Sequence, residues 1–191
     1  MLRSLRPAIV MIALFTLLLG VAYPLAVTGV AQAAFPGQAN GSLVRNADGA
    51  VVGSALIGQP FAEARYLHPR PSAAGDGYNA AGSSGSNLGP LNEDLKTRVA
   101  ESAAAIGTDD GSGSIPADAV TTSASGLDPD ISPAYARLQA QRIAIARGVP
   151  VEEVRKVIDQ QTQGALLGFI GPPHVNVLLT NRALDARFPA A

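Results

Sequence analysis

The chain has 191 residues, a formal net charge of −1 and no cysteine. Its length allows one membrane segment and one folded domain, since single domains cluster near ~100–150 residues. The near-zero charge argues against a nucleic-acid partner, and the absence of cysteine excludes disulfides, thiolate nucleophiles and cysteine-ligated metal centres.

The N-terminal part of the chain contains a long uncharged and apolar segment. Arg6 and Arg45 are the nearest charges on either side of it. A helix over residues 7–30 would span ~36 Å at ~1.5 Å per residue, which is enough to cross a bilayer. Because Arg3 and Arg6 precede this helix, the positive-inside rule predicts that residues 1–6 are a cytoplasmic tail and that the rest of the chain lies outside.

A cleaved signal peptide is the alternative to an uncleaved anchor. Ala31-Gln32-Ala33 matches the small-x-small pattern that a signal peptidase recognises. The most apolar run ends at Leu19, however, and a cut after Ala33 would come too far beyond it for a signal of the usual length. The sequence therefore favours a retained transmembrane anchor.

Small residues and one proline make this helix a candidate for packing against a partner helix in the membrane. Pro24 also removes a backbone hydrogen bond and predicts a kink. That small residues are simply common in this sequence is an equally good explanation. The candidate packing residues are Gly20, Ala22, Pro24, Ala26 and Gly29.

Residues 31–41 are rich in small and polar residues and are predicted to be a linker to a single domain over residues 42–191. Two short apolar runs flank Asp48-Gly49, a pair that is typical of a β-hairpin turn. The stretch 69–90 contains few residues suited to a core, which predicts a long irregular loop with a functional role or a mobile surface loop.

Helices dominate the second half of the predicted domain. Residues 91–107 form the first, with Leu91, Leu95 and Val99 on its apolar face and Gly107 as its end. Ser132-Pro133 and Gly148 are the start and stop signals of the second, which covers residues 132–148. The third runs from about Pro150 to Gly164.

The C-terminal segment "VNVLLT", residues 175–180, alternates in a way that predicts a strand, with Val175, Val177 and Leu179 on one side. The following "NRALDARF" predicts a short helix or turn. Helices and strands mix without a regular βαβ repeat, so the predicted fold class is α+β, preceded by one transmembrane helix.

The residues needed for catalysis or metal binding do not form a recognisable pattern. His68 and His174 are the only histidines, and neither has a second histidine at metal-ligand spacing. The Gly- and Ser-rich stretch 83–90 lacks the lysine of a phosphate-binding loop. Five aspartates are predicted to form a solvated acidic edge, because their spacing matches no calcium loop: Asp109, Asp110, Asp118, Asp128 and Asp130. We therefore expect no catalytic residues and no directly bound cofactor or metal.

A series of unusual segments, found in order along nearly the whole chain, resembles the small C subunit of the Kdp potassium-transporting ATPase. Leu67, Ser84 and Asp130 depart from the family pattern, in which an aromatic residue, a glycine and a histidine are usual, so any role of these three side chains is in doubt. The matching segments are "GSALIGQPF" (53–61), "RPSA" (70–73), "YN" (78–79), "GSNLGP" (85–90), "SASGLDPDISP" (123–133), "ARGV" (146–149) and "VNVLLTN" (175–181).

This resemblance implies an accessory subunit of a bacterial inner-membrane complex, together with a potassium-channel-like pore subunit and a P-type ATPase subunit. The partners would handle ATP and potassium. The family is described as a catalytic chaperone that raises the ATP affinity of the ATPase subunit, but a domain outside the membrane cannot contact cytoplasmic ATP, so such an effect would have to pass through the membrane helices. We therefore expect the domain to dock on the outer face of the pore subunit.

Two other classes of function compete with this one: an anchored envelope domain that binds a ligand or protein unrelated to transport, and an anchored hydrolase, which the missing nucleophile and base pairs disfavour.

For docking, the loop 69–90 and the segment "SGLDPDIS" are the candidates, either facing a partner or supporting the surface that does. The candidate docking residues are Arg70, Pro71, Ser72, Tyr78, Asn79, Ser86, Asn87, Gly89, Pro90, Gly126, Leu127 and Asp128.

Overall fold

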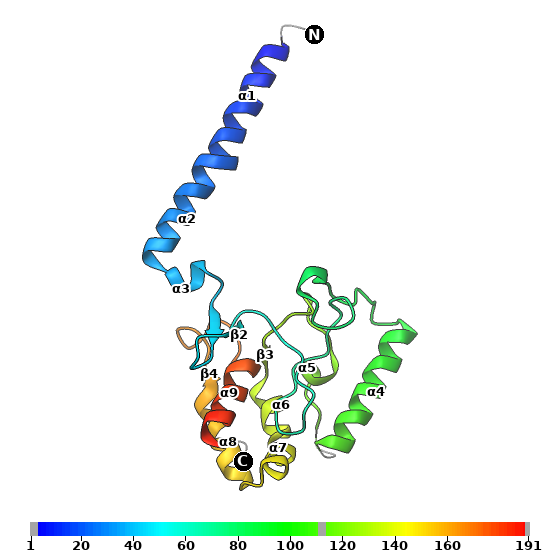
Figure 1. Cartoon of the computed structure of the whole chain (residues 1–191). Helices are drawn as coiled ribbons and strands as arrows, with labels where there is room; N and C mark the ends of the chain where they lie inside the picture. Colours follow the sequence, from blue (N-terminus) through cyan, green and yellow to red (C-terminus); the bar gives the residue numbers. More distant parts are fainter. Residues whose placement is uncertain (1–3, 111–113, 190–191) are drawn as a thin grey trace. The chain divides into compact units, whose positions relative to one another are not determined.

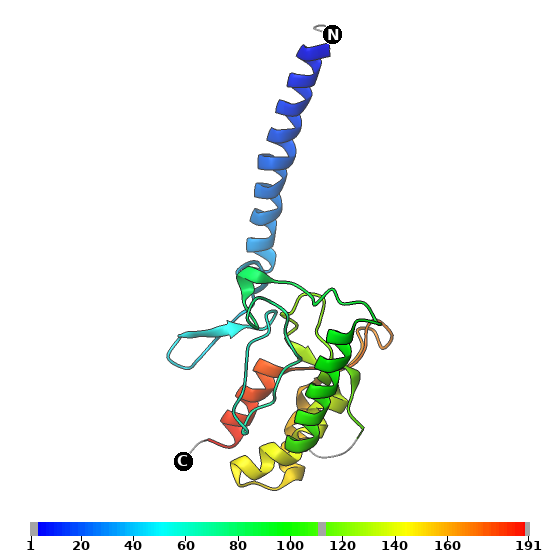
Figure 2. The same ribbon diagram turned by 90° about the vertical axis from the view of Figure 1, so that its right-hand side faces the viewer.

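The computed structural model describes residues 4–110 and 114–189 and divides the chain into two compact units, Met1–Val52 and Gly53–Ala191 (Figures 1 and 2). Arg3, on which the predicted orientation partly depends, lies outside the described residues. The second unit begins at Gly53, eleven residues after the predicted start of the domain at Ser42.

A single apolar helix fills most of the first unit. It runs from Leu5 to Ala34, 30 residues with a mean hydropathy of 2.4, and none of its most apolar window is buried. It is therefore long and apolar enough to cross a membrane. It extends four residues past the predicted span and is followed by the single turn α3 (Pro36–Ala39), so helical structure occupies much of the predicted linker.

The helix passes Pro24 without ending. It consists of α1 (Leu5–Leu17), the π-helical turn η2 (Leu18–Ala22) and α2 (Tyr23–Ala34). Proline lacks an N–H group, and its ring crowds the carbonyl one turn earlier, so a wider turn just before it relieves both problems. The irregularity expected from Pro24 thus takes the form of a π-turn. All of the candidate packing residues are exposed: Gly20, Ala22, Pro24, Ala26 and Gly29.

The predicted hairpin is confirmed. Strands β1 (Leu43–Arg45) and β2 (Val51–Ser54) pair in a two-stranded sheet. The Asp48 carboxylate accepts a hydrogen bond from the Ala50 N–H at 3.0 Å. Gly49 has a φ of +85°, which an L-residue rarely adopts, so the Asp-Gly pair forms the turn for the expected reason.

The second unit combines a small antiparallel sheet with helices, which confirms the α+β class. The strand order is β3-β5-β4, with Val175 at the centre opposite Ile131 on one side and Thr162 on the other. Figure 1 shows α8 and α9 side by side. The elements are η3 (Ala80–Gly82), α4 (Glu93–Asp109), α5 (Ala117–Val120), β3 (Asp130–Ile131), α6 (Pro133–Leu138), α7 (Ala140–Arg147), α8 (Val151–Gln161), β4 (Thr162–Gln163), β5 (His174–Asn176) and α9 (Val177–Arg187).

The core lies where the sheet meets helices α6 to α9. Val154, Val157 and Ile158 on α8 are buried, as the periodicity of that helix predicts. Figure 1 shows α4 apart from α8 and α9, across the second unit, and Ile106 is its buried residue. The buried apolar residues of the core are Leu67, Ile106, Ala119, Ile131, Tyr135, Ala136, Ala140, Ile143, Ala144, Val154, Val157, Ile158, Val175, Val177 and Leu184.

The predicted helix over residues 132–148 has the expected ends but is interrupted. The Ser132 hydroxyl accepts a hydrogen bond from the Tyr135 N–H at 3.0 Å, and Gly148 ends α7 with a φ of +65°. At Gln139 the helix divides into α6 and α7. Gln139 is fully buried and uses its side chain in a tertiary contact described below, which the sequence pattern does not reveal.

The boundaries of α4 differ from the prediction. Asn92 caps its start, accepting from the Asp94 N–H at 2.7 Å, so Leu91 lies before the helix and is 84% exposed. The helix also continues past Gly107 to Asp109. The prediction that Leu91 contributes to an apolar helical face is therefore wrong, because the asparagine cap excludes it from the helix.

The predicted strand over residues 175–180 is wrong beyond Asn176. The Asn176 side chain accepts a hydrogen bond from the Leu179 N–H at 3.1 Å and so caps α9, which begins at Val177. The alternation of apolar residues favours a strand, but the cap and the burial of Val177 and Leu184 against the core favour the helix. The tertiary contacts decide between the two.

Buried side chains bind the backbone of the irregular segment 64–68. Asn181 accepts from the Leu67 N–H at 2.7 Å and donates to the Leu67 carbonyl at 3.0 Å. Gln139 accepts from the His68 N–H at 2.7 Å and donates to the His68 carbonyl at 3.1 Å. Each side-chain amide thus makes, with the N–H and the carbonyl of one residue, the two hydrogen bonds that a neighbouring strand would otherwise make.

Two arginines of α7 complete this arrangement. Arg142 donates to the carbonyls of Ala64 at 2.6 Å and Tyr66 at 3.0 Å. Arg147, whose side chain is 1% exposed, donates to the Arg65 carbonyl at 2.8 Å. The carbonyls of five consecutive residues, 64 to 68, therefore accept hydrogen bonds from side chains of α7, α9 and the turn between α6 and α7.

This network predicts a stability defect in Asn181→Leu. The leucine has the same branching and number of side-chain heavy atoms as asparagine but leaves the buried N–H and carbonyl of Leu67 without partners, at a cost of about 1–3 kcal/mol for each group. Calorimetric unfolding of the full chain in detergent should show a melting temperature lower by several degrees. Gln160→Leu, which removes an exposed amide from α8, is the matched control. Equal melting temperatures for both variants would contradict the assigned role of Asn181.

Candidate functional site

The two segments that the sequence suggested for docking lie against each other. Arg70 and Asp128 form an ion pair, with 2.7 Å between Nη1 and Oδ2, and their side chains are 22% and 28% exposed. The Tyr78 hydroxyl donates a hydrogen bond to the Arg70 carbonyl. Burial, and then the charge of Asp128, raise the pKa of Tyr78, so this phenol keeps its proton and remains a donor.

Ser72 and Gly126 make the closest contact between the segments. The Ser72 hydroxyl donates to the Gly126 carbonyl at 2.6 Å and accepts from the Tyr78 N–H at 2.9 Å. Gly126 has a φ of +65°, and a Cβ there would lie 2.7 Å from the Ala74 nitrogen and from the Ser84 carbonyl oxygen. Glycine at this position is therefore required both by conformation and by space.

A third segment supports the same contact. The Gly58 N–H donates to the Leu127 carbonyl at 2.8 Å. A Cβ on Gly58 would lie 2.5 Å from the Asp128 carbonyl oxygen and 2.9 Å from the Tyr78 ring. The matching stretches 53–61, 70–79 and 123–133 thus meet in one small region, which explains why glycines occur there.

The structure divides the candidate docking residues into two groups. Those brought together make internal bonds or are buried. The prediction that the loop 69–90 offers little to a core is confirmed, since Ala74 is its one buried residue. Whether either group docks to a partner stays a prediction. The internal group is Arg70, Ser72, Tyr78, Gly126, Leu127 and Asp128.

The remaining candidates lie closer to solvent. Asn79 accepts from the Ala81 N–H at 3.0 Å and caps η3. Asn87 has a φ of +53°, a left-handed conformation that asparagine tolerates better than most residues. Pro71 lines the cavity described next, and Ser86 is half-buried. The exposed candidates are Asn79, Asn87, Gly89 and Pro90.

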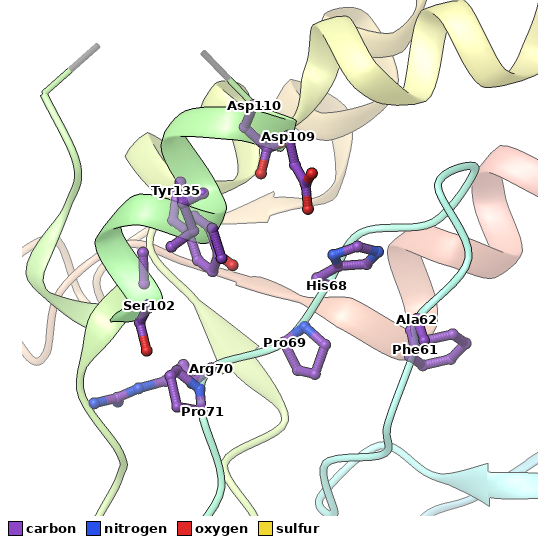
Figure 3. A pocket seen from close by; sticks show the side chains of 13 residues that line it. Phe61, Ala62, His68, Pro69, Arg70, Pro71, Ser102, Asp109, Asp110 and Tyr135 are labelled. Atoms are coloured by element: carbon purple, nitrogen blue, oxygen red, sulfur yellow. The ribbon is translucent and has the colours of Figure 1, made fainter. Parts of the chain in front are cut away.

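A surface cavity of about 380 Å³ adjoins the Arg70 end of this region (Figure 3). Figure 3 shows the His68 imidazole and the Asp109 carboxylate on one side of the cavity, with Arg70 and Ser102 farther along it. The sequence analysis missed this cavity, because its walls come from segments far apart in the chain and its residues have no common spacing. Its lining is Phe61, Ala62, His68, Pro69, Arg70, Pro71, Ser102, Ala105, Ile106, Asp109, Asp110, Ala119 and Tyr135.

His68 and Tyr135 in the cavity favour their neutral forms. Burial, and then the neighbouring Arg142 charge, lower the pKa of His68 below its ordinary value of 6.5, although its ring contact with the Glu63 carbonyl opposes this. Burial, with Asp110 next, raises the pKa of Tyr135 to about 12. Within residues 4–110 and 114–189, no cluster of three or more histidine, aspartate or glutamate side chains could hold a metal ion. The cavity thus offers neutral hydrogen-bonding groups beside one exposed carboxylate, Asp109.

The predicted solvated acidic edge is wrong for four of its five aspartates. Asp110 pairs with Arg142 at 2.8 Å, and their side chains are 3% and 9% exposed. Asp118 accepts from the N–H and hydroxyl of Ser132 at 2.7 and 2.9 Å. Asp128 pairs with Arg70, and Asp130 accepts from the Asn176 amide at 2.9 Å. These carboxylates bind donors brought by the fold from distant parts of the chain.

Comparison with known proteins gives one consistent result. The family model described as "KdpC: K+-transporting ATPase, c chain" matches residues 5–186. The chain belongs to the KdpC family. Among its relatives, the potassium-transporting ATPase KdpC subunit of Caulobacter vibrioides strain NA1000 is 68% identical over 189 residues, which cover 99% of this chain and 96% of the relative.

More distant members of the KdpC family cover the chain equally well. The KdpC subunit of Beijerinckia indica is 62% identical over 99% of this chain and 96% of its own length. That of Mycobacterium bovis strain BCG is 53% identical over 96% and 98%. The match therefore includes both the apolar helix and the α+β unit, and confirms the resemblance on which the sequence analysis relied.

The structure shows which contacts are made by the three residues that depart from the KdpC family pattern. Leu67 is fully buried in the core. The Ser84 N–H donates to the Ser125 carbonyl at 3.0 Å, a backbone bond that any residue except proline can make. Asp130 binds Asn176 and lies 3.8 Å from His174 Nε2. The Leu67 and Asp130 side chains thus have specific contacts in the fold, whereas the Ser84 bond involves only its backbone.

The environment of His68 predicts a pH dependence of stability. Because the pKa of His68 is lowered in the folded state, the unfolded chain binds a proton first as the pH falls below 6.5. His68 therefore contributes a loss of stability between pH 6.5 and its folded pKa, and no loss above pH 6.5. His68→Gln should flatten the pH dependence of the melting temperature in this window, and NMR should show His68 titrating below its ordinary value of 6.5. A His68 pKa at or above 6.5 would contradict this reading.

Proposed function

We propose that this KdpC-family chain is the non-catalytic accessory subunit of an ATP-driven, high-affinity potassium uptake pump. In this role it assembles and stabilises a complex of a channel-like pore subunit and a P-type ATPase subunit. The observation that carries the proposal is the family match over residues 5–186, which spans the membrane helix and the domain together.

The apolar helix supports a role in assembly. All of its described residues are solvent-exposed or nearly so in the isolated chain, and it carries small residues suited to close helix packing. A helix with this composition is stable in a bilayer and free to contact membrane helices of other subunits. We propose that it stays attached and holds the chain within the complex.

The proposed orientation places the N-terminus in the cytoplasm and the α+β unit outside the inner membrane. Arg6 lies in the first turn of the helix, and no further lysine or arginine occurs before Arg45. In this orientation the domain is on the side from which potassium enters during uptake. We propose that it docks on the outer face of the pore subunit.

The same orientation limits how the chain can affect ATP. We propose that any increase in ATP affinity of the ATPase subunit arises through the membrane helices, by favouring one state of the complex, and that the chain itself contacts neither ATP nor potassium as a cofactor. The ion pairs of Arg70, Arg142 and Arg147 with aspartates support this, because they occupy cations that a nucleotide phosphate would need.

Copurification tests the proposed function. A C-terminally tagged full chain, expressed with the pump in bacteria and extracted in mild detergent, should recover two polytopic proteins that mass spectrometry identifies as the pore and ATPase subunits. Its intact mass should include the N-terminal helix. Replacing residues 5–34 by an unrelated membrane helix of the same orientation should reduce recovery severalfold, because the native helix contacts would be lost.

Two outcomes of this experiment would contradict the proposal in different ways. If the tagged chain is recovered without the pump subunits, it is an anchored domain unrelated to transport. A mass corresponding to a chain that starts at Ala34 would show that the helix is a cleaved signal peptide.

The nucleotide proposal makes a separate prediction. The full chain alone in detergent should show no saturable ATP binding in the micromolar range by calorimetry. The assembled pump should have a lower KM for ATP than the same pump assembled with the helix-replaced chain. Saturable micromolar binding to the chain alone would show a direct nucleotide site and overturn the proposal.

A further inference from the structure

An apolar loop follows β4 and stands out on the surface of the second unit. The loop, residues 164–171, reads "GALLGFIG" and projects from the domain, drawn in orange in Figure 1. Leu166, Leu167, Phe169 and Ile170 are 66%, 76%, 78% and 49% exposed. Single exposed apolar residues are ordinary, but four large ones within five positions form a patch of the kind that marks an interaction site.

The backbone of the apolar loop is already ordered. The N–H of Leu166 donates to the Ile170 carbonyl, and that of Ile170 to the Leu166 carbonyl, both at 2.9 Å. The Gly168 N–H donates to the Ala165 carbonyl at 3.0 Å. The loop therefore presents its side chains in a fixed arrangement, which reduces the entropy lost on binding.

Leu167 occupies a backbone conformation that costs stability. Its φ is +54° and that of Gly168 is +83°, the signs found in a type I′ turn, where asparagine and glycine are the favoured residues. A leucine at such a position is strained, and this one is mostly exposed, so the strain is not offset by packing within the chain. Strain of this kind persists where a side chain serves a function.

Charges near the apolar loop restrict what can cover it. Residues 160–173 contain no charged side chain. A groove of about 480 Å³ at the foot of the loop has Asp128 and Asp130 in its lining, together with Leu166, Ile170 and His174, and no lysine or arginine. Asp128 is already paired with Arg70 at 2.7 Å, so Asp130 is the carboxylate of the groove that remains for a cation of a partner. The surface offered to a binding partner is thus an apolar tip beside an acidic groove.

A lipid surface and a second copy of the chain fit this surface poorly. Loops and helices that insert into lipid are typically flanked by lysine or arginine that reach the anionic headgroups, and here the flanking charges are acidic. Two copies meeting through this face would bring their acidic grooves together and repel each other. A protein with an apolar pocket and a basic rim matches both features.

We infer that the apolar loop is the part of the domain that docks into an apolar pocket, rimmed by a basic side chain, on the outer face of another pump subunit. Leu167 and Phe169 are the anchors, and the Asp130 carboxylate of the groove meets the basic rim. This inference rests on the proposed function, which supplies the pump as the assembly but does not say which surface of the chain is used.

Loop variants in the copurification assay test the inference. Leu167→Asn removes one anchor and introduces a residue suited to a positive φ, and Phe169→Ser removes the other anchor. The double variant should recover at least about tenfold less of the polytopic subunits, because buried anchor residues carry most of the affinity of an interface. Leu91→Asn, which changes an apolar residue that is 84% exposed outside the loop, should assemble like the wild type.

Thermal unfolding separates docking from folding. The double variant in detergent should melt at or above the wild-type temperature, since its side chains contact little within the chain and asparagine relieves the strain at position 167. Wild-type recovery by the double variant would overturn the inference and leave the proposed function intact. Failure of the wild type itself to recover the pump subunits would overturn the proposed function, and this inference with it.

Photo-crosslinking identifies what covers the loop. A photoreactive phenylalanine analogue in place of Phe169, activated in membranes that contain the assembled pump, should form a crosslink to a polytopic pump subunit identified by mass spectrometry. The same analogue in place of Leu91 is the control and should not. Crosslinks only to lipid, only to a second copy of the chain, or to nothing would each overturn the inference.

Discussion

The structure depends on how it satisfies the backbone of the irregular segment 64–68. A segment without helix or sheet must find partners for its N–H and carbonyl groups elsewhere, because an unpaired buried polar group costs about 1–3 kcal/mol. Gln139 and Asn181 supply these partners for His68 and Leu67, and two arginines of α7 supply them for the three preceding carbonyls. The side chains of helices thereby replace a strand, and the segment joins the core through Leu67.

The same contacts connect this segment to the candidate site. Arg142 binds the carbonyls of Ala64 and Tyr66, pairs with Asp110 and lowers the pKa of the neighbouring His68. From His68 the chain continues directly into Arg70 and its ion pair with Asp128. A defect in the buried network would therefore disturb the cavity in Figure 3 and the joined docking segments together.

Two kinds of surface result from this arrangement. The region around Ser72 and Gly126 is internally bonded, so its residues shape the domain whether or not they also face a partner. The apolar loop at 164–171 contributes little to the fold and keeps its large side chains in solvent. A subunit that assembles a membrane complex needs both: a rigid framework and side chains left unburied until the partner covers them.

The sequence by itself determined the apolar helix, the hairpin turn at Asp48-Gly49 and the helix ends at Ser132 and Gly148, because each rests on local residue chemistry. It also determined the family, because an ordered series of short matches runs along the chain. Tertiary structure decided what local patterns leave open. The residues after Asn176 form a helix, although their alternation predicted a strand. Four aspartates that were expected to face solvent instead accept hydrogen bonds from donors far away in the sequence. Those partners are separated from them by 14 to 58 positions, and no spacing rule reaches that far, since only the packed core brings such residues within hydrogen-bonding distance.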